Sequence, residues 1–322
     1  MNYIGIDIGG TAVKIGVIDD NGKVLTHAHY RVNFDGYETP ILDTVVKSLR
    51  LFLNEKSVRP YTLKGICVSA TGQVDIHTGI VTGTAGHIKN WQGSKIKETL
   101  ESRFNLPVTV LNDANCAALA EKWIGAAKEV SNAIVVTVGT GIGGGILVNS
   151  EILTGFNGLA GELGHFTINC QGNLCTCGNI GCYEQYASTT ALVHMVTDAA
   201  DKGLIPGEAL HGSQVNGRTV FELLAAHNPA VEDIFEEWLE YVAFGLINLV
   251  HIFNPQLILI GGGISVQETL FIKPLEKKVL ERVMPAFGRR LEIKAAALGN
   301  EAGMIGAVYF CLKSQLSPSS TS

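Results

Sequence analysis

Residues 3–18 read YIGIDIGGTAVKIGVI and residues 133–148 read AIVVTVGTGIGGGILV, and these two stretches decide the fold. Each begins with a β-branched apolar run, passes through glycines and a threonine, and returns to an apolar run, which is typical of two strands joined by a tight turn. The turns are expected at Gly9–Thr11 and Gly139–Gly145. Because this unit occurs twice at a wide separation, it predicts two similar lobes rather than a solenoid.

Strand and helix patterns alternate through the rest of the chain, which predicts α/β lobes with ligands bound at strand ends. Further strands are predicted at Val24–Tyr30, Leu63–Val68, Val108–Leu111 and Leu257–Ile260, and helices at Ile41–Leu53, Ala114–Gly125, Cys182–Ala200, Val231–Phe253, Gln267–Met284 and Glu301–Leu312. We expect a small N-terminal lobe of residues 1–117 plus about 300–316, a large C-terminal lobe of residues 118–299, and a disordered tail at 317–322.

The bulk composition excludes several classes of function. The chain has 322 residues, 46% hydrophobic and 17% charged, which fits two compact domains. A net charge of -6 provides no general attraction for nucleic acid or an anionic membrane, and neither is expected as a partner. The N-terminus lacks a signal-peptide pattern, and the most apolar segment, 242–263, is broken by Pro255. The protein is therefore expected in the cytoplasm.

The first glycine turn has the features of a phosphate site. Gly9 and Gly10 let backbone N–H groups approach phosphate oxygens, Thr11 adds a hydroxyl, and Lys14 adds a positive charge. Asp7, at the end of its strand, offers a carboxylate for Mg²⁺, directly or through water. An ordinary hairpin turn is the structural alternative for the same pattern.

The second glycine turn and a third glycine run extend this prediction. Gly139–Gly145 matches a dinucleotide-binding pattern, but it lies between two strands rather than opening a helix, which disfavours that reading. Two glycine turns, including Thr140 and Gly141, instead suggest that both lobes hold one polyphosphate. Gly262 and Gly263 follow a buried strand and give a flat nucleoside base room to approach the backbone, although a simple strand-to-helix turn would have the same pattern.

The stretch 155–184, GFNGLAGELGHFTINCQGNLCTCGNIGCYE, combines cysteines, a histidine and two glutamates. Three closely spaced cysteines and an upstream histidine form a ligand set suited to tetrahedral zinc, and four protein ligands make such a site structural. The candidate ligands are His165, Cys175, Cys177 and Cys182. Glu162 and Glu184 flank them and would bring two carboxylates to one place. Cys170 is a spare thiol, and buried free thiols are the structural alternative for the whole set.

Asn112 and Asp113 come where a strand gives way to a helix. An Asn or Asp at that point is also an ordinary helix N-cap. A phosphoryl acceptor, however, needs a carboxylate to take its hydroxyl proton, and Asp113 is the candidate base.

Taken together, these residues resemble the ROK family of bacterial sugar kinases and related transcriptional repressors. The resemblance covers nearly the whole chain, from DIGGTAVK at Asp7 to the glycine run at Gly261. Its most specific parts are GELGH at Gly161–His165 and CTCGNIGC at Cys175–Cys182. The resemblance implies an α/β, duplicated two-lobe fold of the actin and hexokinase type, which is ribonuclease H-like, with a central cleft.

The resemblance also implies roles for individual residues. Asp113 would be the general base, and the sugar hydroxyls would contact Gly72, Asn112, Glu162, His165 and Glu184. His165 would bind zinc through one ring nitrogen and the sugar through the other. The ATP phosphates would lie at Gly9, Gly10, Thr11, Thr140 and Gly141, and the adenosine near Gly262 and Gly263. ATP with Mg²⁺ would be the donor, the 6-hydroxyl of a hexose the usual acceptor, zinc structural, and the assembly a homodimer.

Two questions stay open at the level of sequence. Repressors of the family usually carry a helix-turn-helix domain in front, whereas here Asp7 is reached almost at once, so a non-catalytic sugar-sensing regulator is disfavoured. Glucose is the favoured acceptor, but N-acetylmannosamine, N-acetylglucosamine, fructose and a β-glucoside present similar hydroxyls.

Overall fold

The computed structural model describes residues 1–84, 88–205 and 215–316, and it divides into two compact units. The predicted tail at 317–322 lies outside the described residues. Unit 1 comprises Met1–Ser131, Gly145–Gly161 and Ala297–Ser322, and unit 2 comprises Asn132–Gly144 and Glu162–Ala296.

The expected lobe boundary near residue 117 falls inside helix α3 (Asp113–Trp123), and residues 118–131 and 145–161 belong to unit 1. The reason is packing of α3 against α10 (Ala302–Leu316). A Cβ added to Gly306 would lie 1.7 Å from the carbonyl oxygen of Cys116, so the two helix backbones are in close contact. The whole of α3 therefore belongs to unit 1.

Unit 1 is built on a five-stranded sheet in the order β3-β2-β1-β4-β7. Its strands are β1 (Asn2–Ile8), β2 (Ala12–Asp19), β3 (Val24–Arg31), β4 (Leu63–Ala70) and β7 (Val108–Asn112). The first three strands are antiparallel neighbours, whereas β1, β4 and β7 run parallel. The sheet therefore has three strand carboxyl ends at one edge.

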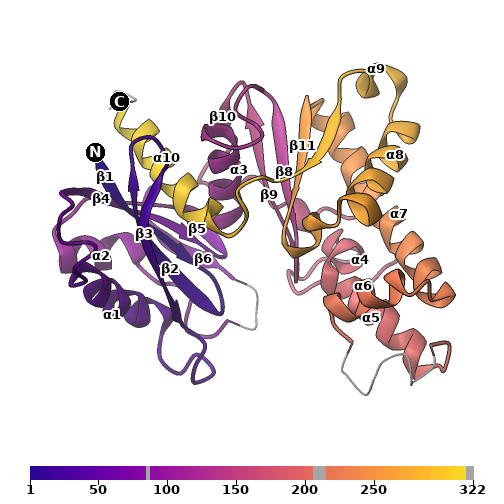
Figure 1. Ribbon diagram of the computed structural model, residues 1–322, viewed down its shortest axis with the longest axis horizontal. Coiled ribbons are helices and arrows are strands. Elements are labelled where there is room, and N and C mark those ends of the chain that lie inside the picture. The colour runs from indigo at the N-terminus through magenta and orange to yellow at the C-terminus, as the bar shows by residue number, and fades with distance from the viewer. Residues whose placement is uncertain (85–87, 206–214, 317–322) are drawn as a thin grey trace. The chain divides into compact units, whose positions relative to one another are not determined.

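Helices cover both faces of the unit 1 sheet (Figure 1). Successive side chains of β1 point to opposite faces, so they pack against different helices. Ile4 and Ile6 belong to the core cluster that includes residues of α1 (Ile41–Leu53) and α2 (Ile96–Phe104). On the opposite face, a Cβ added to Gly5 would lie 2.9 Å from the carbonyl oxygen of Met304, because α10 crosses the sheet there. A short hairpin of β5 (Gln73–Asp75) and β6 (Ile80–Gly83), which the sequence analysis did not predict, completes this unit.

The second sheet has the order β10-β9-β8-β11-β12. Its strands are β8 (Ala133–Val138), β9 (Ile142–Val148), β10 (Glu151–Ile152), β11 (Leu257–Gly261) and β12 (Glu292–Ala295). The glycine turn predicted at Gly139–Gly145 is shorter than expected, because β9 already begins at Ile142. Gly144 has a packing role within that strand, since an added Cβ would lie 2.2 Å from Cδ1 of Leu163.

The helical layer of unit 2 is centred on α7 (Pro229–Phe253). Among the described residues of unit 2, the other helices are η1 (Leu163–His165), α4 (Glu184–Ala187), α5 (Thr189–Asp201), α6 (Gly217–Ala225), η3 (Gly263–Val266), the π-helix η4 (Glu268–Ile272), α8 (Lys273–Arg282) and α9 (Pro285–Gly288). A Cβ added to Gly245 would lie 2.1 Å from the ring of Tyr183, so this glycine admits a buried aromatic side chain against α7.

Two of the predicted helices are divided in the structure. The helix expected at 182–200 is interrupted at Ser188, whose extended backbone and side chain cap α5 by accepting a hydrogen bond from the amide of Ala191. The helix expected at 267–284 begins as η4 and continues as α8. Within the described ranges, no helix, α7 included, has the length and apolarity needed to span a membrane.

Candidate active site

Three parallel strands of unit 1 end side by side. The register pairs Ile8 with Ala70 and Ala70 with Asn112, so the residues that follow these strands lie along one edge of the sheet. Those residues are Gly9 and Gly10, Thr71 and Gly72, and Asp113. The carboxyl edge of parallel strands is where such sheets bind their ligands.

The first glycine turn brings together the side chains predicted for a phosphate and metal site. The Oδ1 atom of Asp7 accepts a hydrogen bond of 2.8 Å from the Ser69 hydroxyl, and its Oδ2 atom lies 2.9 Å from the Lys14 ammonium. The Asp7 side chain is 17% exposed. A Cβ added to Gly303 would lie 2.4 Å from Asp7 Oδ1, so the carboxylate lies against the beginning of α10, where helix N–H groups favour negative charge.

The second strand end is shaped by Gly72. Its φ of 91° is in the left-handed region that favours glycine, and an added Cβ would lie 2.6 Å from the carbonyl oxygen of Gly83. The Gly72 carbonyl accepts a hydrogen bond of 2.9 Å from Nδ2 of Asn112. Gly72 and Asn112, both predicted as sugar contacts, are therefore direct neighbours.

The helix cap at the third strand end is Asn112, not Asp113. The Asn112 Oδ1 atom accepts hydrogen bonds from the amides of Ala114 and Asn115 at 2.9 and 3.2 Å. Asp113 is the first residue of α3, and its Oδ1 atom accepts from Asn112 Nδ2 at 3.1 Å and from the Ala114 amide at 2.8 Å. The Asp113 side chain is partly exposed and held by its neighbours, which leaves the capping function to Asn112.

The four predicted zinc ligands of unit 2 lie together. Each of the four side chains offers one ligand atom, and these atoms all lie within 4.8 Å of one another. The residues are His165, Cys175, Cys177 and Cys182. The Sγ atoms of Cys177 and Cys182 are 3.6 Å apart, as are Cys175 Sγ and His165 Nδ1. Zn–S bonds of about 2.3 Å give a tetrahedron with edges of about 3.7 Å, so the donor set fits a tetrahedral zinc ion.

The thiols of this cluster differ in their surroundings. Burial raises the pKa of Cys182 to about 12, whereas the backbone N–H of Asn179 lowers the pKa of Cys177. Zinc binds thiolates, so metal binding at this cluster releases protons. Cys170 is exposed and does not belong to the group of ligand atoms.

Two glutamates flank the imidazole of His165 on its two nitrogens. Glu184 Oε1 lies 3.9 Å from Nδ1, and Glu162 Oε2 lies 3.9 Å from Nε2. Glu184 also reaches the second glycine turn, since its Oε2 atom accepts a hydrogen bond of 3.3 Å from the Ile142 amide. A Cβ added to Gly141 would lie 2.6 Å from the same oxygen. The sequence predicted this group of three residues, and the structure brings it together.

The second glycine turn is fixed by the start of α5. The Thr189 amide donates to the Gly139 carbonyl at 2.8 Å, and the Thr190 hydroxyl donates to the Thr140 carbonyl at 2.8 Å. This turn therefore lies between the Glu184 carboxylate on one side and helix α5 on the other.

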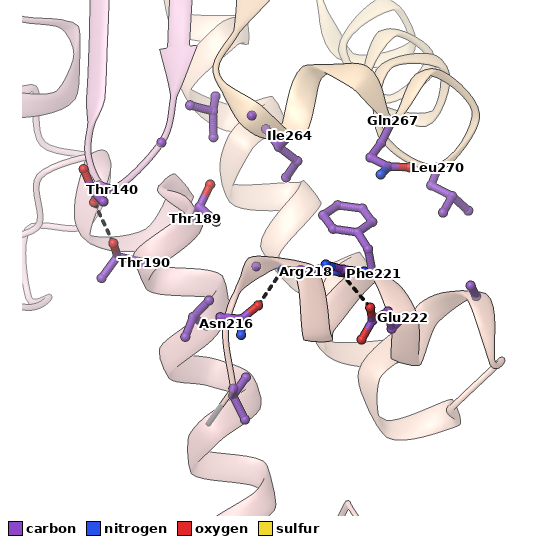
Figure 2. A pocket seen from close by; sticks show the side chains of 17 residues that line it. Thr140, Thr189, Thr190, Asn216, Arg218, Phe221, Glu222, Ile264, Gln267 and Leu270 are labelled. Atoms are coloured by element: carbon purple, nitrogen blue, oxygen red, sulfur yellow. Dashed lines mark hydrogen bonds and ion pairs between the residues drawn. The ribbon is translucent and has the colours of Figure 1, made fainter. Parts of the chain in front are cut away.

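Unit 2 also contains a pocket of about 850 Å³ beside this turn (Figure 2). Of the predicted nucleotide contacts, Thr140 and Gly263 line it, whereas Gly141 and Gly262 do not. Gly262 has a backbone role instead, since its φ is 94° and an added Cβ would lie 2.1 Å from the Val138 carbonyl oxygen. The pocket is also lined by Val138, Gly139, Thr189, Thr190, Val193, Val215, Asn216, Gly217, Arg218, Phe221, Glu222, Ala225, Ile264, Gln267 and Leu270.

The α6 wall of this pocket was not predicted from the sequence. Figure 2 shows Phe221 of α6 near Ile264 and Leu270, and the ion pair between Arg218 and Glu222. Asn216 caps α6 by accepting hydrogen bonds from the amides of Arg218 and Thr219. The Asn-Gly pair before an apolar pattern of helical spacing was the available signal.

The sequence as a whole matches one family. A profile of the ROK family matches residues 3–314. The chain therefore belongs to the ROK family, as the motifs at Asp7, Gly161 and Cys175 indicated.

Individual relatives agree over nearly the full length. The β-glucoside kinase of Listeria innocua serovar 6a is 35% identical over 317 residues, which cover 98% of this chain and 99% of the relative. The glucokinase of Halalkalibacterium halodurans is 33% identical over 311 residues, covering 94% and 93%. The crystal structure of a ROK family glucokinase from Streptomyces griseus in complex with glucose and AMPPNP aligns with a TM-score of 0.81 at 30% identity, covering 95% and 98%. The predicted α/β fold of the actin and hexokinase type is confirmed.

Proposed function

We propose that this protein is an ATP-dependent sugar kinase that transfers the γ-phosphate to a hexose hydroxyl, with the 6-hydroxyl of glucose as the first candidate acceptor. The observation that carries the proposal is the row of strand ends in unit 1. There Ile8 pairs with Ala70, and Ala70 pairs with Asn112. The residues that follow these three strand ends, the Gly9–Thr11 turn, Gly72 and Asp113, therefore lie along one edge of the sheet. Full-length similarity to relatives named glucokinase and β-glucoside kinase supports the same activity.

In the proposed reaction, Asp113 acts as the general base. Its carboxylate accepts the proton of the sugar hydroxyl as that oxygen attacks the γ-phosphorus, and the bond from phosphorus to the bridging oxygen of ADP breaks. The Asn112 amide holds the Asp113 carboxylate at 3.1 Å. A carboxylate fixed in this way loses little orientational freedom on reaching the transition state.

The phosphates of ATP are proposed to contact the two glycine turns. In unit 1 the contacts are Gly9, Gly10, Thr11 and the Lys14 ammonium, and in unit 2 they are Thr140 and Gly141. Backbone N–H groups in such turns stabilise phosphate oxygens. Asp7 and the Ser69 hydroxyl beside it form an oxygen donor set suited to Mg²⁺, which when bound neutralises charge on the transferred phosphoryl group.

The adenosine is proposed to occupy the pocket of unit 2 between Thr140, Phe221 and Gly263. Its volume of about 850 Å³ and its apolar wall of Phe221, Ile264 and Leu270 suit a nucleoside. This pocket lies directly beside the Thr140 turn, where phosphates would follow the nucleoside.

Glu162, His165 and Glu184 are proposed to bind sugar hydroxyls, together with Gly72 and Asn112 of unit 1. His165 presents Nδ1 toward Cys175 and Nε2 toward Glu162. Its Nδ1 would therefore ligate the zinc ion, which supplies a fixed anchor for the ring, and Nε2 would face the sugar. Four protein ligands make this zinc site structural.

Substitution of the base tests the mechanism. In Asp113→Asn, kcat for sugar phosphorylation should fall by at least about a thousandfold, because the proton acceptor is lost. Asp43→Asn is the matched control, since Asp43 is an exposed aspartate in the first turn of α1 in the same unit. Activity of Asp113→Asn near that of the parent, with circular dichroism unchanged, would remove Asp113 from the reaction.

A β-glucoside is the second candidate acceptor. It is favoured by the 35% identity to the Listeria innocua β-glucoside kinase, which is similar in degree to the 33% identity to a glucokinase. Comparing kcat/KM for glucose, N-acetylmannosamine, N-acetylglucosamine, fructose and cellobiose decides between these acceptors. A non-catalytic regulator would give no sugar-dependent ADP in the same assay. We also propose a homodimer, on the family resemblance, and light scattering tests it.

A further inference from the structure

Glu121 is a buried carboxylate that the proposed reaction does not use. It lies on α3 in unit 1 and is 1% exposed. Removing a carboxylate from water is costly unless hydrogen bonds satisfy its oxygens. The position of these hydrogen bonds therefore indicates what Glu121 stabilises.

Both oxygens of Glu121 accept hydrogen bonds from backbone amides. Oε1 accepts from Ala297 at 2.7 Å and from Leu298 at 2.8 Å, and Oε2 accepts from Ala126 at 2.8 Å. Gly125 makes room for the carboxylate, since a Cβ added there would lie 2.2 Å from Oε2. Hydrogen bonds to a charged acceptor are stronger than those between neutral groups, so Glu121 is a firm anchor for these amides.

Ala297 and Leu298 are the first two residues of the segment by which the chain returns from unit 2 to unit 1. Unit 2 ends at Ala296, and unit 1 resumes at Ala297. The return segment, defined as Ala297–Glu301, contains the 3₁₀ turn η5 (Gly299–Glu301) and leads directly into α10. Glu121 thus fixes the first residues of unit 1 after the crossing.

The far end of the return segment is bonded to the predicted phosphate site. The Asn300 carbonyl accepts a hydrogen bond of 2.9 Å from the Lys14 ammonium, which also pairs with Asp7 Oδ2 at 2.9 Å. The same segment leads into Gly303, which lies against the Asp7 carboxylate. A continuous series of contacts therefore connects Glu121, the return segment, Lys14 and Asp7.

We propose that Glu121 is a positioning residue for the Asp7–Lys14 pair, acting through the return segment. By fixing the amides of Ala297 and Leu298, it sets the place of the Asn300 carbonyl, which in turn directs the Lys14 ammonium. Glu121 is given no direct contact with ATP or sugar, because it is 1% exposed and its oxygens bond to backbone amides. The inference rests on the proposed function in one respect, since it assigns Lys14 and Asp7 to the phosphates and Mg²⁺ of the donor.

The variant Glu121→Gln tests this role. Its side chain keeps one oxygen acceptor but places an NH₂ group, a donor, beside amides that need acceptors. We expect the KM for MgATP and the Mg²⁺ concentration for half-maximal rate to rise at least fivefold, with the KM for the sugar within twofold of the parent. Glu101→Gln is the matched control, because Glu101 also accepts a backbone hydrogen bond, from the Val108 amide at 3.2 Å, in the same unit. Glu101→Gln should leave the KM for MgATP and the Mg²⁺ concentration for half-maximal rate unchanged.

Binding measurements separate this inference from the proposed function. Calorimetry with Mg²⁺ and AMPPNP needs no phosphoryl transfer, so it reports on the donor site even if no sugar proves to be a substrate. Affinity should fall at least fivefold in Glu121→Gln and stay at the parent value in Glu101→Gln. Equal affinity in Glu121→Gln and the parent would overturn the inference.

A second variant covers the case in which Glu121→Gln does not fold. Gly125→Ala keeps the carboxylate but displaces Glu121, because the added methyl would lie 2.2 Å from its Oε2 atom and 2.8 Å from its Cα atom. It should weaken binding of Mg²⁺ and AMPPNP in the same direction. Accelerated amide hydrogen exchange at Ala297 and Leu298 would show that a folded Gly125→Ala protein has lost the anchor. If such a protein bound Mg²⁺ and AMPPNP as tightly as the parent, the inference would likewise be overturned.

Discussion

The two glycine turns come from similar sequence units but have different surroundings. The Gly9–Thr11 turn of unit 1 joins two antiparallel strands beside a charged pair, Asp7 and Lys14. The Gly139–Gly141 turn of unit 2 accepts hydrogen bonds from the Thr189 amide and the Thr190 hydroxyl of α5 on one side, and it opens onto a largely apolar pocket. The charged turn is suited to phosphate chemistry, and the other to holding a nucleotide by its nucleoside end.

This difference shows that a repeated backbone unit does not carry function by itself. In both turns glycine leaves the backbone free of a side chain, which is the shared contribution of the repeat to the proposed phosphate contacts. The residues that distinguish them come from other elements: Ser69 and α10 at the first turn, and α5, α6 and Glu184 at the second. We therefore expect substitutions of first-turn residues such as Asp7 to lower the rate, in addition to any effect on MgATP binding, and substitutions at the second turn to affect binding alone.

Among the substitutions that compare the two turns, the largest effect is expected at the first turn. Asp7→Asn should lower kcat by roughly a hundredfold or more, because a charged ligand for Mg²⁺ is lost where phosphoryl charge is stabilised. Asp19→Asn is a control in the same sheet, since Asp19 accepts backbone hydrogen bonds in the β2–β3 turn, away from Gly9–Thr11. Steady-state rates over a Mg²⁺ series provide the measurement. A parent-like kcat in Asp7→Asn would break the proposed distinction between the turns.

The next effect is expected at the Cys/His cluster, which reaches the second turn through Glu184. Cys175→Ser should lower zinc content from about one ion per chain and weaken sugar binding by roughly 10- to 100-fold, since the anchor for His165 is lost. Metal analysis and sugar calorimetry test this, with Cys170→Ser as the control thiol. If Cys175→Ser retained both zinc and sugar affinity, the metal site would have to involve other ligands.

A smaller effect is expected in the pocket. Phe221→Ala should raise the KM for ATP by about fivefold to tenfold with kcat unchanged, because about 1 to 1.4 kcal/mol of apolar contact is lost. Ile252→Ala on α7, at a side chain that is 69% exposed and outside the pocket lining, is the control. Initial-rate kinetics with varied ATP separate the two constants. A fall in kcat alone would assign a rate-determining role to the second turn instead.

The smallest effect is expected at a site that belongs to neither turn, the ion pairs of Glu240 on α7 with Lys278 and Arg282 of α8. Burial raises the pKa of Glu240, but hydrogen bonds from Arg282 and Lys278 outweigh it and hold the pKa below its ordinary value of 4.5. A lowered pKa stabilises the folded state above pH 4.5, and this contribution is lost as the pH falls through the folded-state value.

Glu240→Gln should accordingly reduce the free energy of unfolding by about 1 kcal/mol at pH 7 and lower Tm by about 2–4 °C, without changing KM or kcat. Thermal unfolding followed from pH 7 down to pH 3 tests the sign, since the difference between parent and variant should shrink below pH 4.5. A difference that grew on acidification would contradict the assigned direction of the pKa shift.

Local patterns in the sequence predicted much of the fold and the site. The β-branched runs predicted β1 and β8, and the helix expected at Ile41–Leu53 matches α1 residue for residue. The cysteine spacing predicted the cluster with His165, because these ligands lie within one short stretch. In each case the residues that determine the structure are close in sequence.

Features that depend on distant partners were not predictable in the same way. The bonds of Glu121 to Ala297 and Leu298 span 176 and 177 positions, and nothing near Glu121 indicates them. The wall of the pocket combines α5, α6 and the η3–η4 region, whose meeting depends on how unit 2 packs as a whole. The division of the predicted helix at Ser188 shows the same limit, since a capping serine and an interior serine look alike in sequence.

Product analysis shows whether this protein transfers phosphate from ATP to a sugar hydroxyl. Purified protein with MgATP and each sugar of the panel should produce ADP only when an acceptor sugar is present, and ³¹P NMR should identify a hexose 6-phosphate in equal amount. Sugar kinase activity would be contradicted if ADP formed independently of sugar. It would also be contradicted if no sugar led to ADP formation while AMPPNP still bound.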